Sequence, residues 1–270
     1  MDPRQACLDC LAQEPPALFE AALWIAAEHL PAYSPAHTLR ELDELVRQIG
    51  ASLDDRASAS ERAQGLLRRM SEQGFCEDDD FPLQPRSALL PLVLQRRQGQ
   101  PLSLALVAME LARRLDIPLV GVNFPGRFLL RVPQADHLLD PATGRRLYTP
   151  DCRELLLRLQ GPKSELQAAY LKQASPGEIL QRLSRNLRQL HSAAGEPLAA
   201  LKDAQRVIEL GPVGAADHEA RAGLYRQLDC PQAERYDLER ALLLSDDPTE
   251  QLRLGQRLGE LAPPTSRALH

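Results

Sequence analysis

The sequence has few aromatic residues, no excess of positive charge and no long apolar run. Phenylalanine, tryptophan and tyrosine make up 4% of the 270 residues, and the formal net charge is −5. A nucleic-acid binder normally carries a basic face, and single-strand binders add aromatic rings for stacking. A membrane-spanning helix needs about 20 consecutive apolar residues. The composition therefore excludes nucleic acid and membrane as expected partners.

The chain also lacks the segments that would direct it elsewhere or bind a cofactor. Its first residues, MDPRQACLDCLAQEPP, carry acids where a signal peptide has a basic and then an apolar stretch. Neither a glycine-rich nucleotide loop nor a cluster of histidines and carboxylates is present in the sequence. We therefore expect a cytoplasmic protein with no cofactor and no metal. No pattern indicates an oligomeric state.

The five cysteines are scattered and odd in number, which indicates reduced thiols rather than a disulfide framework. Cys7 and Cys10 form an isolated CLDC. A zinc site needs two further ligands, and a redox pair normally lies at a strand-to-helix turn. Because neither context is evident, we interpret the two cysteines as residues near the start of a helix.

Four consecutive acids occur in CEDDDFPLQPRS, residues 76–87. Calcium loops alternate their ligands and contain a glycine, and this stretch does neither. Acids mixed with prolines and turn formers are typical of an irregular surface loop. We therefore predict a solvated loop rather than a metal site.

Apolar residues recur at helical spacing through most of the chain, and only one region changes to short β-branched runs. Ser58 and Glu61 form a capping-box pattern, and Thr149 with Pro150 indicates another helix start. We predict an α+β fold that is mostly helical, with a small antiparallel sheet packed on a central helix. The helices are expected at 16–30, 34–49, 58–73, 101–115, 149–159 and 175–194, and the strands at 117–124, 127–132 and 137–141.

The last hundred residues contain an internal repeat. GEPLAALKDAQRVIELGP begins at Gly195 and DCPQAERYDLERALLLSD at Asp229, 34 residues later. A 34-residue helix-turn-helix period is typical of tetratricopeptide repeats, and a plain stack of helical hairpins is the alternative. We expect a first domain over 1–165, repeats over 176–262 that end in the helix PTEQLRLGQRLGEL, and a loose tail APPTSRALH.

The segment RRQGQPLSLALVAMELARRLDIPLVGVNFPGRFLLRV, followed by HLLDPATGRRL, resembles the bacterial SirB family. In that family a transglutaminase-like domain precedes tetratricopeptide repeats. The arginine pair, the helix after it, the Pro-Gly turn and the LLDP turn occur in the family's order. The resemblance runs from about Leu18 to Leu261.

The resemblance implies a papain-like catalytic site whose key residues have changed. In the superfamily a cysteine at a helix N-terminus attacks an acyl group, with histidine and aspartate on neighbouring strands. Alignment on the helix and on the DIP motif gives Pro101 for the cysteine, Arg127 for the histidine and Asp140 for the aspartate. SirB relatives commonly have histidine in this turn, as PGHF, so Arg127 departs from them too.

Two of these three residues cannot do the inherited chemistry. Proline has no nucleophile, and an arginine that stays protonated cannot act as a general base. We expect Arg127 and Asp140 to form an ion pair instead. Ser103 with His137 and Asp140 is the fallback arrangement, although strand alternation puts the last two on opposite faces. Cys152, in the first turn of a helix, is expected to have a somewhat lowered pKa but has no histidine nearby in sequence.

The sequence therefore supports one preferred function and one alternative. The first is a non-catalytic regulatory protein, in which a degenerate transglutaminase-like domain is joined to repeats that bind a protein or peptide of unknown identity. The second is a hydrolase or acyltransferase that acts on amide or ester bonds through a non-standard nucleophile. Within the first reading, the repeats either present a groove or only complete the fold.

Overall fold

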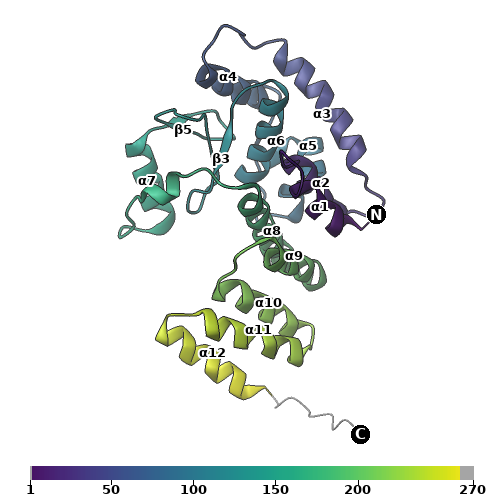
Figure 1. The fold of residues 1–270 in the computed structure, drawn as a ribbon, viewed down its shortest axis with the longest axis vertical. Helices are drawn as coiled ribbons and strands as arrows, with labels where there is room; N and C mark the ends of the chain where they lie inside the picture. The colour runs from purple at the N-terminus through teal and green to yellow at the C-terminus, as the bar shows by residue number, and fades with distance from the viewer. Residues whose placement is uncertain (1, 262–270) are drawn as a thin grey trace. The chain divides into compact units, whose positions relative to one another are not determined.

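The computed structural model describes residues 2–261, and the chain divides into two compact units, one up to Leu183 and one from Ser184 onward. The predicted loose tail, 262–270, lies outside the described residues. Helices dominate both units, and strands occur in the first unit (Figure 1). The α+β prediction is confirmed. The boundary between the two units falls inside helix α8 (Pro176–Ala193). The domain limits expected from the sequence, 1–165 and 176–262, stay a prediction.

Helices form most of the first unit and enclose its core. The predicted helices are all present, and the structure adds the short α5. Cys7 and Cys10 lie buried in a helix, α1, but in its middle and near its end rather than near its start. No helix within residues 2–261 is long and apolar enough to cross a membrane. The elements are α1 (Pro3–Leu11), α2 (Leu18–Ala27), α3 (Pro35–Gly50), α4 (Ala59–Glu72), η1 (Pro85–Ser87), α5 (Leu90–Arg96), α6 (Pro101–Arg114), α7 (Thr149–Gln160) and η2 (Ala168–Leu171), with α8 (Pro176–Ala193) crossing the division.

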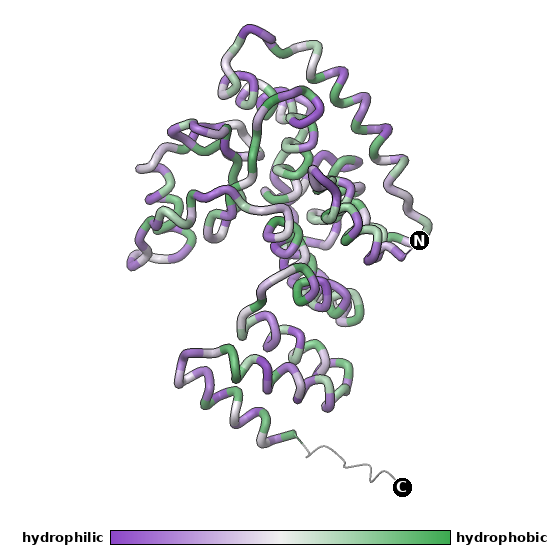
Figure 2. The backbone as a smooth tube through the Cα atoms, in the orientation of Figure 1, coloured by the Kyte–Doolittle hydropathy of each residue, from purple (hydrophilic) through white to green (hydrophobic). Residues whose placement is uncertain are grey.

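Helix α6 lies at the centre of the first unit because its small residues allow close approach on several sides. Ala105, Ala108 and Ala112 are completely buried, as are Leu104 and Leu111. The helix contacts α2, α3, α4 and α5 and also the strands. Figure 2 shows hydrophobic and hydrophilic residues alternating along the helices of the first unit, as expected of helices with one buried face.

The helix starts follow local hydrogen bonding. At α4 the Ser58 amide donates to the Glu61 carboxylate (2.9 Å) and the Glu61 amide donates to Ser58 Oγ (3.3 Å), so the predicted capping box is confirmed. The Ser58 hydroxyl also donates to the Glu61 carboxylate (2.7 Å), and this bond, followed by the bond from the Ser58 amide, lowers the pKa of Glu61. At α7 the cap is Tyr148 rather than Thr149, because the Asp151 carboxylate accepts from the Tyr148 amide (2.9 Å).

The main sheet is an antiparallel meander in the order β3-β4-β5-β6. Its inner residues, including Val122, Phe124, Leu129 and Leu138, form a core with Leu156 of α7. A separate two-residue parallel pair joins β1 to β2 and places Glu77 opposite Gly99. The sequence predicted three of these strands and missed the rest, which are too short for an alternating pattern. The strands are β1 (Cys76–Glu77), β2 (Gln98–Gly99), β3 (Val120–Val122), β4 (Leu129–Arg131), β5 (Leu138–Leu139) and β6 (Arg146–Leu147).

The second unit is a succession of helices in which α9 contacts α10, α10 contacts α11 and α11 contacts α12 (Figure 1). Small residues mark the contacts: Ala200 and Ala204 pack with Leu224, while Ala222 and Ala241 pack with Leu238 and Leu254 in a second cluster. After the C-terminal part of α8 come α9 (Pro197–Leu210), α10 (Ala215–Gln227), α11 (Pro231–Leu244) and α12 (Pro248–Glu260).

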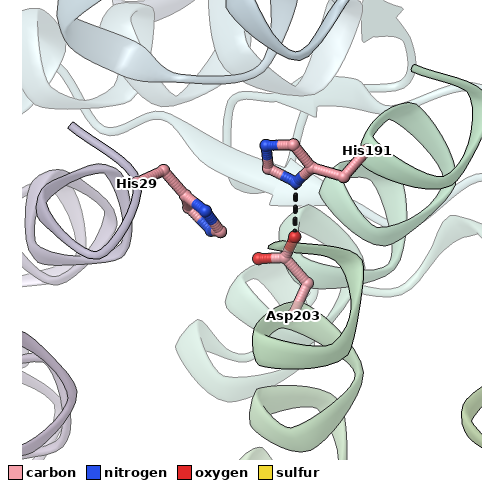
Figure 3. Close-up of side chains that lie close together, drawn as sticks. All are labelled: His29, His191 and Asp203. Atoms are coloured by element: carbon pink, nitrogen blue, oxygen red, sulfur yellow. Dashed lines mark hydrogen bonds and ion pairs between the residues drawn. The ribbon is translucent and has the colours of Figure 1, made fainter. Parts of the chain in front are cut away.

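Two completely buried aspartates occupy matching positions in this succession. Asp203 of α9 accepts from His191 Nδ1 (2.7 Å, Figure 3) and from Arg206 Nη1 (2.8 Å). Asp237 of α11 lies 34 residues later and accepts from a histidine and an arginine of α10. A buried carboxylate is stable only when charged or polar donors surround it. The same device thus recurs at the period of the sequence repeat.

Removing the second aspartate is expected to destabilise this unit. Asp237→Ala leaves the donors His218 and Arg221 facing a vacated site, and breaking a buried pair costs about 3 kcal/mol. Asp246→Ala changes an exposed acid of the following loop and should alter the free energy of unfolding by less than about 0.5 kcal/mol. Urea denaturation of the full chain, followed by circular dichroism, measures both. Equal effects would show that the buried carboxylate is not a stabilising centre.

Candidate functional site

The Pro-Gly turn before β4 determines where Arg127 lies. The Arg127 amide donates to the Phe124 carbonyl (3.2 Å), and Gly126 has a φ of 75°. Proline followed by a residue at positive φ is the signature of a type II turn, which favours glycine at that position. A side chain at Gly126 would also come within 3.1 Å of Leu159 Cβ. The turn therefore fixes the backbone from which the Arg127 side chain leaves.

The Arg127 guanidinium binds two carboxylates. Its Nε donates to Asp140 Oδ2 (2.9 Å), and its Nη2 lies 2.8 Å from the same oxygen and donates to Glu77 Oε2 (2.7 Å). The predicted ion pair between Arg127 and Asp140 is confirmed, and Glu77 is a partner that the sequence analysis missed. Burial alone would lower the pKa of Arg127, but the two carboxylates outweigh it, so this pKa lies above its ordinary value. Arg127 stays charged and cannot accept a proton.

Asp140 is held by its own turn as well as by Arg127. Its Oδ1 accepts from the amides of Ala142 (3.0 Å) and Thr143 (3.1 Å), and the Asp140 amide donates to the Arg145 carbonyl. These bonds shape the turn between β5 and β6. Both carboxylate oxygens are therefore engaged, one by the turn and one by the guanidinium.

The acidic segment lies largely at the surface, as predicted, but two of its aspartates are anchored by ion pairs. Asp78 is buried and binds Arg96 (2.7 Å), and Asp80 binds Arg86 (2.6 Å). Burial would raise the pKa of Asp78, but hydrogen bonds from Arg96 and the Asp80 amide hold it below its usual value. Pairing of β1 with β2 then holds Glu77 next to the segment that leads into α6. The motif RRQGQP does not by itself indicate the ion pair between Arg96 and Asp78, because the two residues are far apart in sequence.

Pro101 is the first residue of α6, two residues after Gly99, which pairs with Glu77. The structure therefore brings the predicted nucleophile position into the neighbourhood of the carboxylate that holds Arg127. Ser103 points into the core: it is fully buried, and its Oγ has no hydrogen-bond partner among the described residues. The fallback triad of Ser103, His137 and Asp140 is not assembled, because His137 and Asp140 have other partners.

His137 lies in a different hydrogen-bonded group. Its Nε2 is 3.1 Å from Ser60 Oγ at the start of α4, and its Nδ1 is 2.9 Å from Asp136 Oδ1. The Tyr148 ring packs against the imidazole with ring centroids 5.5 Å apart. Ser60 was not among the residues singled out from the sequence, because 77 residues separate it from His137.

A cavity of about 90 Å³ adjoins this histidine. His137, Thr149 and Cys152 line it together with apolar residues of β5 and β6. Cys152 is buried, and its pKa is raised by burial and then by the nearby Asp151 charge. The expectation of a lowered pKa was wrong, because the Cys152 side chain packs into the core between α7 and the sheet, away from water.

Comparisons with known proteins show the family of this chain. The family model of the transglutaminase-like superfamily matches residues 36–185. The chain therefore belongs to the transglutaminase-like superfamily. Within it, relatives that include Protein SirB1 of Salmonella typhimurium, 28% identical over 205 residues, assign the chain to the SirB family.

The relatives match part of their own length. A UPF0162 protein of Xylella fastidiosa is 37% identical over 177 residues, which covers 63% of this chain and 63% of that protein. For Protein SirB1 the match covers 73% of this chain and 75% of the relative. The UPF0162 protein YchA of Escherichia coli K12 is 30% identical, and the match covers 55% of this chain and 56% of that protein. The chain thus spans about 63% of the length of the first of these relatives. No solved structure matches the chain significantly.

Loss of the Arg127 guanidinium is expected to destabilise the first unit. Arg127→Met leaves Asp140 and Glu77 without their shared cation, and we expect a decrease of about 1–3 kcal/mol in the free energy of unfolding, because Glu77 is partly exposed. Arg145→Met breaks an exposed pair with Asp151 and should cost less than about 1 kcal/mol. Urea denaturation compares them, and equal values would contradict a structural role for Arg127.

Restoring the superfamily residues tests whether the old geometry persists. In Pro101→Cys/Arg127→His an imidazole faces a thiol at the start of α6, and the thiol pKa should fall. Iodoacetamide at pH 6 should then alkylate the double variant about 10-fold faster than Pro101→Cys alone. Mass spectrometry of the modified peptide measures the rates. Equal rates in two folded variants would mean that the positions no longer face each other.

Proposed function

We propose that the chain is a cytoplasmic, protein-binding regulatory protein whose inherited transglutaminase-like site is non-catalytic. In this proposal the second unit is a short tetratricopeptide array that binds a protein or peptide partner. The observation that carries the loss of catalysis is the position of Arg127, whose guanidinium lies between Asp140 and Glu77 where the superfamily has a general base.

The electrostatics of that site support the proposal. A histidine base must lose and regain a proton near neutral pH, and an aspartate must orient it. Here Asp140 and Glu77 stabilise a permanent cation instead. Pro101 supplies no thiol at the helix start. The site keeps the charges of the old arrangement and uses them to hold two strand segments together.

Exposed apolar side chains on the second unit support a binding role. Tyr236 and Leu243 are 52% and 76% exposed, and they lie seven residues apart on the same face of α11. Leu198 on α9 and Leu252 on α12 are 66% and 65% exposed. Large apolar residues left in water are common at binding surfaces, where aromatic anchors contribute most of the affinity.

The cysteines support a reducing location. No disulfide is present among the described residues, and three of the five cysteines are buried. Disulfides are rare in the cytosol, where thiols are kept reduced. The proposed cytoplasmic location follows from this compartment preference.

Substitutions on α11 test the binding role. We expect a partner captured from native lysate by the full chain to bind Tyr236→Ala/Leu243→Ala about 10-fold or more weakly, because each truncation removes exposed apolar contact area. Phe81→Ala is the matched control, since Phe81 is fully exposed but lies on the first unit. Titration with the identified partner measures both affinities. An affinity unchanged by the α11 substitutions, or lowered equally by Phe81→Ala, would contradict binding through the repeats.

A further inference from the structure

Ser60, His137 and Asp136 form a continuous hydrogen-bonded chain outside the inherited site. Ser60 Oγ lies 3.1 Å from His137 Nε2, and His137 Nδ1 lies 2.9 Å from Asp136 Oδ1. An ionised carboxylate accepts hydrogen bonds only, so the proton of a neutral imidazole must reside on Nδ1. Nε2 is then the acceptor for the Ser60 hydroxyl. This is the tautomer that a general base requires.

The position of Ser60 adds donors for a negative oxygen. Ser60 is the second residue of α4, a helix of 14 residues. The first amides of a helix have no carbonyl four residues earlier within the helix. The Glu61 amide is taken by Ser58 Oγ, whereas Ala59 and Ser60 precede it in the same turn. Such amides beside a nucleophile can stabilise the oxyanion that forms when it attacks a carbonyl.

The surroundings hold the imidazole and leave space beside it. His137 is 7% exposed, and the Tyr148 ring packs against it at 5.5 Å. The Asp136 side chain is 83% exposed, so this end of the hydrogen-bonded group is in contact with solvent. The cavity of about 90 Å³ that touches His137 is lined in part by Leu138 and Leu147. Its wall also includes Arg131, Asp136 and Thr149, and Ser60 contacts His137 from outside the residues that line it. A space of this size fits a short acyl group rather than a peptide.

We propose that Ser60, His137 and Asp136 form an acyl-transfer site that hydrolyses short-chain esters, with Ser60 as the nucleophile. This site is separate from Pro101, Arg127 and Asp140, and it adds an activity to the proposed binding role without depending on it. Asp140 takes no part, because both of its oxygens are engaged by its turn and by Arg127.

The chemistry balances with water as the second reactant. His137 Nε2 takes the Ser60 hydroxyl proton while Oγ bonds to the ester carbonyl carbon, and the first-turn amides of α4 face the oxyanion. The bond from that carbon to the alcohol oxygen then breaks, and His137 returns the proton to the leaving alcohol. Water next gives a proton to His137 as its oxygen attacks the acyl carbon. The bond to Ser60 Oγ breaks, and Oγ recovers the proton.

A fluorophosphonate probe tests this site directly on the full chain. We expect peptide mapping to find the label on Ser60, with no label in Ser60→Ala. In His137→Asn the labelling rate and the turnover of p-nitrophenyl acetate should both fall about 100-fold or more, because general-base assistance contributes 10²–10⁴-fold. Asp136→Asn should reduce them about 10-fold, less than the ~10⁴ of a buried triad aspartate, since Asp136 is mostly exposed.

Ser71→Ala, on the same helix and exposed, is the matched control and should label at the wild-type rate. If Ser60→Ala does not fold, Ser60→Cys keeps a nucleophile there, and iodoacetamide should modify it faster than the same change combined with His137→Asn. A folded wild type that stays unlabelled, a label at another residue, or rates unaffected by His137→Asn would overturn the proposal. Loss of partner binding on α11, with labelling of Ser60 intact, would instead concern the binding surface alone.

Discussion

The ion pairs of Arg127 are the interaction on which the first unit's arrangement depends. One guanidinium joins the turn after β5, through Asp140, to the segment before α5, through Glu77. That segment is itself fixed by Arg96 and by pairing with the residues that lead into α6. Three stretches distant in sequence therefore meet at one cation. The resemblance to the superfamily assigns its nucleophile, base and orienting acid to Pro101, Arg127 and Asp140.

A permanent cation at position 127 limits what the site can do. A histidine there would exchange protons near neutral pH, whereas Arg127 has a pKa raised further by its two carboxylates. Fixed charge is suited to holding strands and poorly suited to proton transfer. The hydrogen bonds of Ser60, His137 and Asp136 lie before β5, whereas Asp140 follows that strand.

The second unit also depends on carboxylates paired with charged donors, and there the arrangement occurs twice. Asp203 and Asp237 are completely buried, and each is surrounded by a histidine and an arginine. Burying a carboxylate is unfavourable unless several donors compensate for the lost water. Such groups tolerate few alternative packings, so they fix how successive helices lie against each other. The outer faces remain free to vary, and on α11 they carry Tyr236 and Leu243.

Much of the fold could be predicted because its signals are local. Helical spacing predicted α2, α3, α4 and α6, the capping box at Ser58 predicted the start of α4, and Pro125-Gly126 predicted the turn before β4. The two-residue strands β1, β2 and β6 were missed because no periodic pattern fits into so few positions, whereas the equally short β5 was predicted from the run HLLDP. The cap at Tyr148 was missed because it uses a backbone amide rather than a side-chain oxygen.

At the candidate site, too, some properties follow from the sequence and others from the tertiary structure. The sequence by itself determined that no thiol stands at Pro101 and that Arg127 is a permanent cation, because these are properties of the residue types. The tertiary structure decided that Glu77 joins Asp140 on that cation, that burial raises the pKa of Cys152, and that Ser60 reaches His137. These outcomes depend on distances and solvent access across long stretches of chain. Only the packing of α4, α6 and the sheet sets those quantities.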